Sequence, residues 1–318
     1  MVTLTPSLLI LNGKAAQREE VRAAVEALRE SGAQLAVRVT WEGGDVARFV
    51  DEAVALGARR VIAGGGDGSL NEAVNALMAL PQAQRPALGI LPLGTANDFA
   101  VAAEIPQTAL EALQLAQTAM PIAVDLLRVR AGDETRWSLN LVTGGFGTQV
   151  TLETDPDLKK HLGGLAYFLT GLTRLGQMGA MQAQLRAENF EWQGEFVALA
   201  VGNGRQAGGG RVLCPDASLN DGLLDFTLVP EMPDGGQMLS MLGTALSEGR
   251  EAALAQAALQ GRGQWLEVSA DEVFCLNLDG EPFEADAFRI DCMPAALSLC
   301  LPPASALLLQ AVSGTVAS

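Results

Sequence analysis

The 318-residue sequence is poor in several residue types on which functional sites commonly depend. It contains one histidine, His161, and four cysteines without a C-x-x-C pair, so a zinc site would find almost no ligands. Basic residues number 21 against 37 acidic ones, and the net charge of −16 repels phosphate backbones at long range. We therefore expect reduced thiols, no zinc centre and no nucleic-acid partner.

Long apolar runs are also missing. No stretch reaches the roughly 18 apolar residues of a membrane span, and the first residues lack the basic segment of a signal peptide. We expect a cytoplasmic protein. With 49% hydrophobic and 18% charged residues, the composition is typical of a globular chain, and the length fits two domains. The sequence does not indicate an oligomeric state.

Strand-like and helix-like patterns alternate through the first part of the chain. The expected strands are 7–11, 34–39, 59–63 and 88–91, and the expected helices are 17–30, 46–56, 71–80 and 109–117. This alternation predicts a parallel sheet covered by helices on both faces. We place this α/β domain at residues 1–125.

The pattern changes after residue 125, and strand-like runs dominate. These runs are 125–130, 137–143, 196–201, 223–228 and 274–278, interrupted by helical stretches at 158–175 and 238–246. We predict a β-rich C-terminal domain over residues 126–318. Its last strands are candidates for a return to the first domain.

A glycine-rich turn, Gly64-Gly65-Gly66-Asp67-Gly68, connects the strand 59–63 to a helix. Glycine permits close approach, so the amides at the helix start can converge on phosphate oxygens. The turn fits neither the Walker nor the Rossmann pattern, because it lacks the lysine and has an acid among the glycines. Asp67 beside phosphate favours a bridging Mg²⁺; the alternative is a structural turn in which Asp67 or Ser69 caps the helix.

A second loop, Pro92-Leu93-Gly94-Thr95-Ala96-Asn97-Asp98-Phe99, follows the strand 88–91 and also leads into a helix. Ligands of open α/β sheets bind at the carboxyl ends of the strands. We therefore expect the two loops to face one ligand.

Taken together, these two loops resemble the diacylglycerol kinase catalytic superfamily. NAD kinases and phosphofructokinases are more distant members. A closer resemblance, over nearly the whole chain, is to bacterial YegS-type lipid kinases. The segments that carry it are 40–42 (TWE), 91–100 (LPLGTANDFA), 144–148 (GGFGT), 203–210 (NGRQAGGG) and 278–282 (LDGEP). It implies an NAD kinase/diacylglycerol kinase-like α/β domain followed by a β-rich sandwich domain.

The resemblance implies ATP as phosphate donor, Mg²⁺ as catalytic metal, and a lipid hydroxyl as acceptor, for example of diacylglycerol or phosphatidylglycerol, reached by transient contact with a membrane. Glu281 is implied to be the general base. The implied ATP contacts are Thr40, Gly66, Asp67, Gly68, Ser69, Leu70, Asn71, Glu72 and Thr95. A second, regulatory Mg²⁺ is implied at Ser218, Asp221 and Leu223.

Several positions leave alternatives open. Ser69 stands where the superfamily usually has threonine, and Lys14 follows an Asn-Gly turn instead of the usual Asn-Pro turn. Asp125 either joins the Asp67 metal network or is a strand-end acid. The apolar stretch 165–172 is either a lip for lipid entry or a core helix. The rival functions are an NAD kinase and a non-catalytic nucleotide or lipid sensor.

Overall fold

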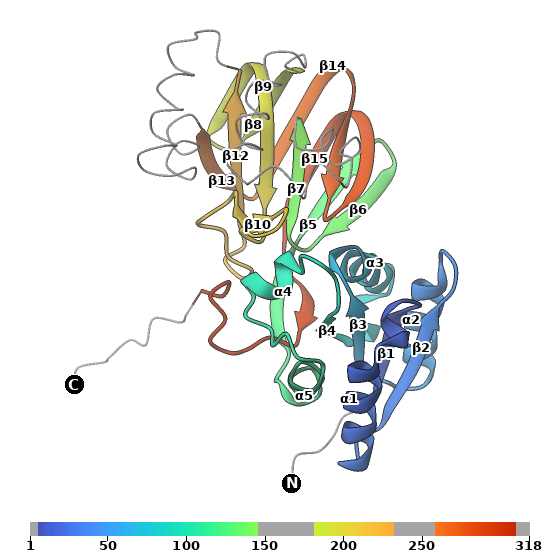
Figure 1. Cartoon of the computed structure of the whole chain (residues 1–318). Coiled ribbons are helices and arrows are strands. Elements are labelled where there is room, and N and C mark those ends of the chain that lie inside the picture. The colour runs from blue at the N-terminus through green and yellow to red at the C-terminus, as the bar shows by residue number, and fades with distance from the viewer. Residues whose placement is uncertain (1–5, 146–180, 232–257, 310–318) are drawn as a thin grey trace, which may run out of the picture.

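The computed structural model describes residues 6–145, 181–231 and 258–309, which form two lobes (Figure 1). The predicted helical stretches 158–175 and 238–246 lie outside the described residues, as do His161 and the apolar stretch 165–172. In the described part of the chain, no helix is both long and apolar enough to cross a membrane.

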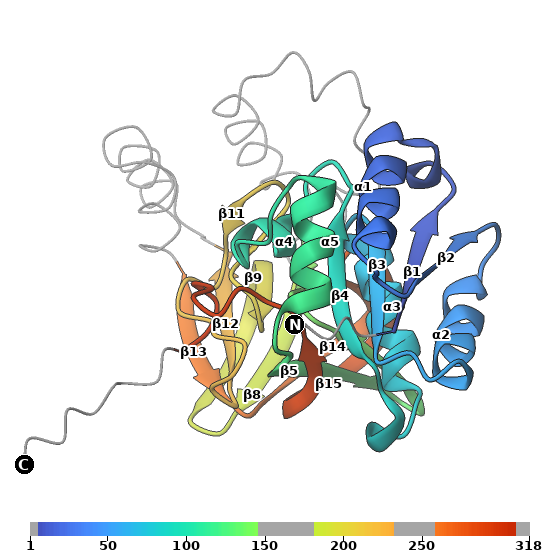
Figure 2. The ribbon, with the colours of Figure 1, turned by 90° about the horizontal axis from the view of Figure 1, so that it is seen from below.

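The N-terminal lobe is a parallel sheet with the strand order β4-β3-β1-β2. Its strands are β1 (Ser7–Asn12), β2 (Leu35–Thr40), β3 (Arg60–Gly65) and β4 (Ala87–Pro92). Its α-helices are α1 (Glu19–Glu30), α2 (Asp45–Ala55), α3 (Asp67–Met78), α4 (Asp98–Ala102) and α5 (Ala109–Thr118). Two short 3₁₀ turns span Ala15–Gln17 and Gln82–Gln84. Helix α1 packs beside α5 and α2 beside α3, and the two pairs cover opposite faces of the sheet (Figure 2).

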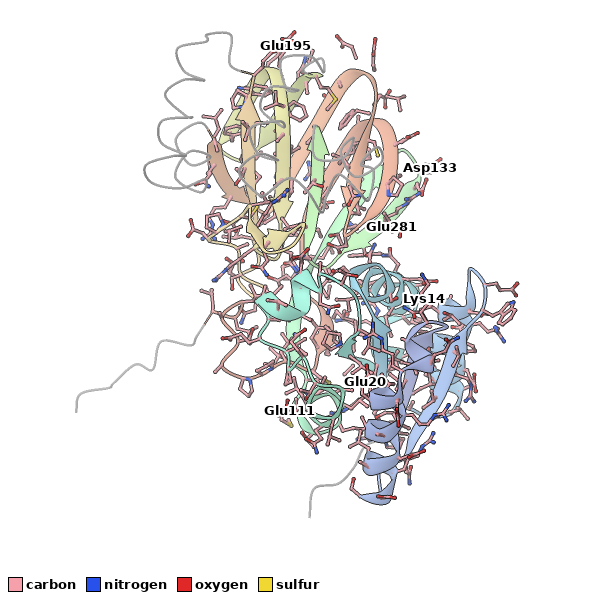
Figure 3. All side chains as sticks on the ribbon, viewed as in Figure 1. Lys14, Glu20, Glu111, Asp133, Glu195 and Glu281 are labelled. Atoms are coloured by element: carbon pink, nitrogen blue, oxygen red, sulfur yellow. The ribbon has the colours of Figure 1, made fainter. Side chains whose placement is uncertain are left out.

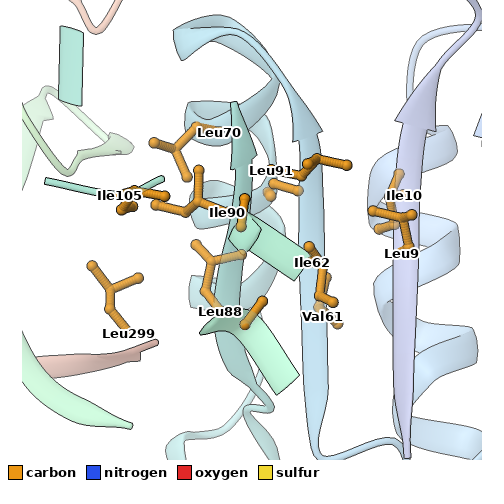
Figure 4. Close-up of a cluster of buried hydrophobic side chains, with 14 of the residues drawn as sticks. Leu9, Ile10, Val61, Ile62, Leu70, Leu88, Ile90, Leu91, Ile105 and Leu299 are labelled. Atoms are coloured by element: carbon orange, nitrogen blue, oxygen red, sulfur yellow. The ribbon is translucent and has the colours of Figure 1, made fainter. Parts of the chain in front are cut away.

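Helices on both faces explain why the inner strands β1, β3 and β4 are buried along nearly their whole length, whereas the edge strand β2 is only partly buried. Strands β3 and β4 are buried at every residue. Leu9, Ile62 and Leu88 are completely buried, and Figure 4 shows them in one cluster with Leu70 from α3. Removal of this apolar surface from water supplies the main stabilisation of the lobe.

The C-terminal lobe is built mainly from antiparallel strands. They are β5 (Ile122–Ala131), β6 (Glu134–Ser138), β7 (Leu141–Gly145), β8 (Met181–Ala187), β9 (Phe190–Gly202), β12 (Leu224–Pro230), β13 (Leu259–Gly263), β14 (Trp265–Leu278) and β15 (Glu281–Leu299), with a small hairpin of β10 (Gln206–Ala207) and β11 (Arg211–Val212). A second core, with Leu185, Phe226 and Ile290 among its members, fills this lobe.

Strand β15 connects the two lobes. It pairs with β14 and β5 in the C-terminal lobe, and its last residue, Leu299, lies parallel to Leu88 of β4. The N–H of Cys300 donates to the carbonyl of Leu88 at 2.9 Å. The end of β15 therefore extends the sheet of the N-terminal lobe, and Leu299 belongs to its core (Figure 4).

Two local predictions were wrong. The single strand expected at 137–143 is divided into β6 and β7, because the N–H groups of Leu139, Asn140 and Leu141 donate to the carboxylate of Asp279 instead of to a neighbouring strand. The helix expected at 71–80 begins earlier, at Asp67, so the second half of the glycine-rich turn is its first turn.

Candidate active site

A pocket opens at the carboxyl ends of β1, β2 and β3. Strands β1 and β3 are neighbours in the sheet, but the chain leaves them toward opposite faces, which makes this the switch point where open α/β sheets bind ligands. The residues that line the pocket are Ile10, Asn12, Thr40, Val46, Ala63, Gly64, Ser69, Glu72 and Ala73. Three of the predicted ATP contacts, Thr40, Ser69 and Glu72, therefore share one opening.

The glycine-rich turn and the loop after β4 are in direct backbone contact. A Cβ on Gly94 would lie 2.5 Å from Cα of Gly66, and a Cβ on Gly66 would lie 3.1 Å from Cα of Gly94. Only a residue without a side chain fits at this crossing. The contact brings the N-terminus of α3, with its unpaired first-turn amides, next to the second loop.

Asp67 joins the two loops through its side chain. Its carboxylate accepts from the N–H groups of Asp98 at 3.2 Å and Phe99 at 3.3 Å. A carboxylate has about four lone-pair positions, so these two long bonds leave capacity for a metal-bound water. In the second loop, Asn97 adopts a positive φ of 52° and its side chain bonds Gly94.

The other predicted ATP contacts differ in exposure. Thr95 is exposed at the tip of the second loop. Leu70 and Asn71 are buried, and Nδ2 of Asn71 donates to the carbonyl of Leu278 in the C-terminal lobe at 3.1 Å. The side chains of Leu70 and Asn71 therefore serve packing and the contact between lobes.

Glu281, the first residue of β15, brings a carboxylate from the C-terminal lobe to the glycine-rich turn. Its Oε1 lies 3.9 Å from the position that a Cβ on Gly68 would occupy. Figure 3 shows Glu281 at the edge of the C-terminal lobe that faces α3, and Lys14 at the upper end of β1. Sequence separation between Gly68 and Glu281 is large, and only the fold places them together.

A second acid, Glu72, faces the same region. The pKa of Glu72 is raised, first by partial burial and then by the negative charges of Glu281 and Asp45, although the side chain still reaches solvent. Carboxylates that repel one another at one opening favour binding of a cation there.

Comparison with known proteins agrees with this geometry. Residues 6–129 match the diacylglycerol kinase catalytic domain, and residues 140–301 match the YegS C-terminal NAD kinase beta sandwich-like domain. A Xanthomonas oryzae protein named "Probable lipid kinase YegS-like" is 51% identical over 296 residues, which cover 92% of this chain and 95% of that protein. A Stenotrophomonas maltophilia protein of the same name is 49% identical over 302 residues, covering 94% and 97%.

The chain belongs to the family of YegS-like lipid kinases. A crystal structure of a diacylglycerol kinase from Bacillus anthracis has the same fold, with a TM-score of 0.71, 20% identity, and coverage of 96% of this chain and 100% of that one. The predictions of the family and of an α/β domain followed by a β-sandwich-like domain are confirmed.

In this YegS-like lipid kinase, the residues predicted to hold a second metal lie in the segment before β12. The carboxylate of Asp221 is 8% exposed and lies 3.4 Å from Nη2 of Arg262. Its Oδ1 also accepts from the N–H of Leu223 at 3.0 Å, while the Ser218 hydroxyl bonds the carbonyl of Leu307. A guanidinium therefore already supplies positive charge beside Asp221.

Asp125 lies beside the segment that holds Asp221, as its hydrogen bonds show. Its carboxylate accepts from the N–H groups of Gly222 at 2.7 Å and Ala295 at 2.8 Å. Burial raises its pKa, the two N–H donors act in the opposite direction, and the charge of Asp221 adds to the rise. Both of its oxygens are thus engaged by the C-terminal lobe.

Sequence reasoning missed the role of Asp98. Its buried carboxylate accepts from the N–H groups of Gly209 at 3.0 Å and Gly210 at 2.7 Å, and its carbonyl accepts from Gln206. This acid ties the second loop to the β10–β11 hairpin of the other lobe. In the sequence, the run of three glycines at 208–210 was the one sign of an unusual backbone at this place. In the structure all three glycines have a positive φ.

Proposed function

We propose that this protein transfers the γ-phosphate of ATP to a hydroxyl group of a membrane lipid. The observation that carries the proposal is the carboxylate of Glu281 beside Gly68, at the N-terminus of the helix that follows the glycine-rich turn. A phosphate cradle and a proton acceptor beside it are what phosphoryl transfer to an alcohol needs.

The N-terminal lobe would hold ATP. The segment from Gly66 to Glu72 would carry the phosphate contacts: the amides before Leu70, whose own N–H already donates to the carbonyl of Gly66, can donate to phosphate oxygens, and the helix dipole favours negative charge at this end. Thr40 and Ser69 line the pocket and offer hydroxyls. Exposed Thr95 is available from the second loop to reach a phosphate.

Mg²⁺ fits the oxygen donors present. Among the described residues no three acidic, histidine or cysteine side chains gather as a metal cage, and Mg²⁺ typically takes one or two carboxylates and completes its shell with phosphate and water oxygens. Asp67, held between the two loops, is the carboxylate we assign to this ion. When bound, Mg²⁺ neutralises charge on the transferring phosphate.

Glu281 would act as the general base. Its side chain is exposed and its Oε1 lies beside Gly68, so a lipid hydroxyl can donate its proton to a carboxylate oxygen of Glu281 while the hydroxyl oxygen attacks the γ-phosphorus of ATP. The bond between that phosphorus and the β,γ-bridging oxygen breaks, and ADP leaves. The rest of the rate acceleration would come from holding ATP and the lipid hydroxyl in line between the lobes, because phosphoryl transfer depends mainly on positioning and charge stabilisation.

A second Mg²⁺ at Asp221, with the carbonyls of Ser218 and Leu223, is part of the proposal. This ion would share Asp221 with Arg262, which is 46% exposed and can move aside. Metal binding there is therefore expected to be weaker than at the phosphates.

The test is lipid phosphorylation by wild type and by Glu281→Gln, with γ-labelled ATP, Mg²⁺ and mixed micelles that contain diacylglycerol, phosphatidylglycerol and a sphingoid base. Loss of a general base costs about 10²- to 10⁴-fold in turnover. Glu284→Gln, also an exposed glutamate of β15, is the matched control and should behave as wild type.

The outcomes separate the rival functions. A labelled lipid made by wild type and Glu284→Gln, and not by Glu281→Gln, supports the proposal and identifies the substrate class. NADP formed from NAD in a parallel assay would favour an NAD kinase. ATP binding without any labelled product would favour a sensor.

A further inference from the structure

Asp279 is a carboxylate that the proposed chemistry does not use, and the main chain surrounds it. Its oxygens accept hydrogen bonds at 2.8–3.3 Å from Ser138 Oγ and from the N–H groups of Leu139, Asn140 and Leu141. Burial raises its pKa, and these donors act in the opposite direction. This acid therefore fastens the β14–β15 turn to the corner between β6 and β7.

That turn determines where Glu281 lies. Asp279 and Gly280 form it with positive φ values of 50° and 107°, and the N–H of Gly280 donates to Asn277 at 2.8 Å. The side chain of Glu281 is itself exposed. Its position near Gly68 therefore depends on the turn that precedes it.

Helix α3 holds the same corner from the other lobe. Asn71 and Asn75 are four residues apart and so lie on one face of the helix. Asn71 donates to the carbonyl of Leu278, immediately before the turn, at 3.1 Å. Asn75 pairs reciprocally with the main chain of Trp137: its Nδ2 donates to the carbonyl at 3.0 Å and its Oδ1 accepts from the N–H at 2.9 Å.

We propose that Asp279 and Asn75 are positioning residues that hold Glu281 in register with the phosphate-binding turn across the boundary between the lobes. The same helix, α3, supplies both the phosphate-binding amides and the two asparagines. One rigid element thus fixes the distance between the phosphate and the base. The inference rests on the proposed role of Glu281.

The experiment is a double-mutant cycle on lipid phosphorylation. Asp279→Asn and Asn75→Leu are made in the wild-type and in the Glu281→Gln backgrounds. A displacement of roughly 1 Å at a catalytic group costs about 10²-fold, so each variant should lower kcat by about 10- to 100-fold in the wild-type background. The KM for ATP should change little, because the nucleotide contacts belong to the N-terminal lobe.

In the Glu281→Gln background the same substitutions should cause no further loss, because the group that they position is already gone. Asp133→Asn, an exposed aspartate in the turn between β5 and β6, is the matched control and should keep the wild-type kcat. Thermal unfolding identifies any variant that does not fold, and Asn75→Leu carries the test if Asp279→Asn fails.

Three results are decisive. If Glu281→Gln has lost turnover but Asp279→Asn and Asn75→Leu keep the wild-type kcat, the positioning inference is overturned while the proposed function stands. Equal losses in both backgrounds would mean a general effect on the fold and would also overturn it. If Glu281→Gln keeps wild-type turnover, the proposed role of Glu281 itself is wrong.

Discussion

Gly94→Ala should separate the two loops that form the phosphate end of the site. The added methyl group would lie 2.5 Å from Cα of Gly66, whereas ordinary contacts begin at 3.4 Å, so the loops must move apart by about 1 Å. The nearest obstacle is the backbone of Gly66, which cannot rotate away, and the side-chain oxygen of Asn97 would lie 2.8 Å from the added methyl group as well. Relaxation therefore has to displace the glycine-rich turn, the second loop or both.

The expected cost has two parts. Overpacking at a tight contact destabilises by about 1–3 kcal/mol, which urea unfolding measures. Displacement of the phosphate-binding turn by about 1 Å should lower kcat/KM for ATP by about 10²-fold. Initial rates of lipid phosphorylation at varied ATP concentration give this ratio.

The matched control is Gly43→Ala, since a Cβ at Gly43 meets nothing within 4 Å. This variant should match wild type in both stability and kcat/KM. If Gly94→Ala also keeps the wild-type kcat/KM, contact between the two loops does not shape the site, and the reasoning is refuted.

Two further predictions concern ionisation. The pKa of Asp45 is lowered to about 2, first by the main-chain N–H of Trp41, then by Arg48 and then by the N–H of Glu42. The ionised carboxylate therefore stabilises the fold at a pH above its unfolded pKa of 3.8, and this contribution is lost as the pH falls toward 2. Asp45→Asn should therefore narrow the difference in urea midpoint between neutral and acidic pH, and an unchanged difference would contradict the assignment. Burial raises the pKa of Cys214 and of Cys292 to about 12, so iodoacetamide at about pH 8 should label neither before unfolding. Half-exposed Cys275 should react first, as peptide mass spectrometry would show; early labelling of Cys214 would argue against its burial.

Local patterns in the sequence were sufficient for the strands and most of the helices of the N-terminal lobe, although α3 begins earlier than expected. Apolar strands alternate there with amphipathic helices, and each boundary is marked by glycine or by a turn residue, so short-range physics decides the structure. The glycine-rich turn could be proposed as an anion cradle for the same reason: its residues are consecutive, from Gly64 to Glu72.

Contacts between distant segments could not be derived in this way. The division of the stretch 137–143 into two strands results from the carboxylate of Asp279, which lies about 140 residues further along the chain and competes for the strand's N–H groups. Nothing in the local sequence shows that the side chain of Asn71 donates to the carbonyl of Leu278 in the other lobe. The hydrogen-bond partner of such a side chain depends on which distant segments the fold brings together, and local sequence patterns do not contain that information.

The sequence by itself therefore determined the α/β pattern, the position of the glycine-rich turn and, through its motifs, the family. Only the tertiary structure decided that Glu281 lies against Gly68, that Asp98 holds the glycines of the β10–β11 hairpin, and that β15 returns to β4. The physical reason is that propensity and periodicity act over a few residues, whereas the approach of two lobes depends on hydrogen bonds and packing that form only when the whole chain has folded.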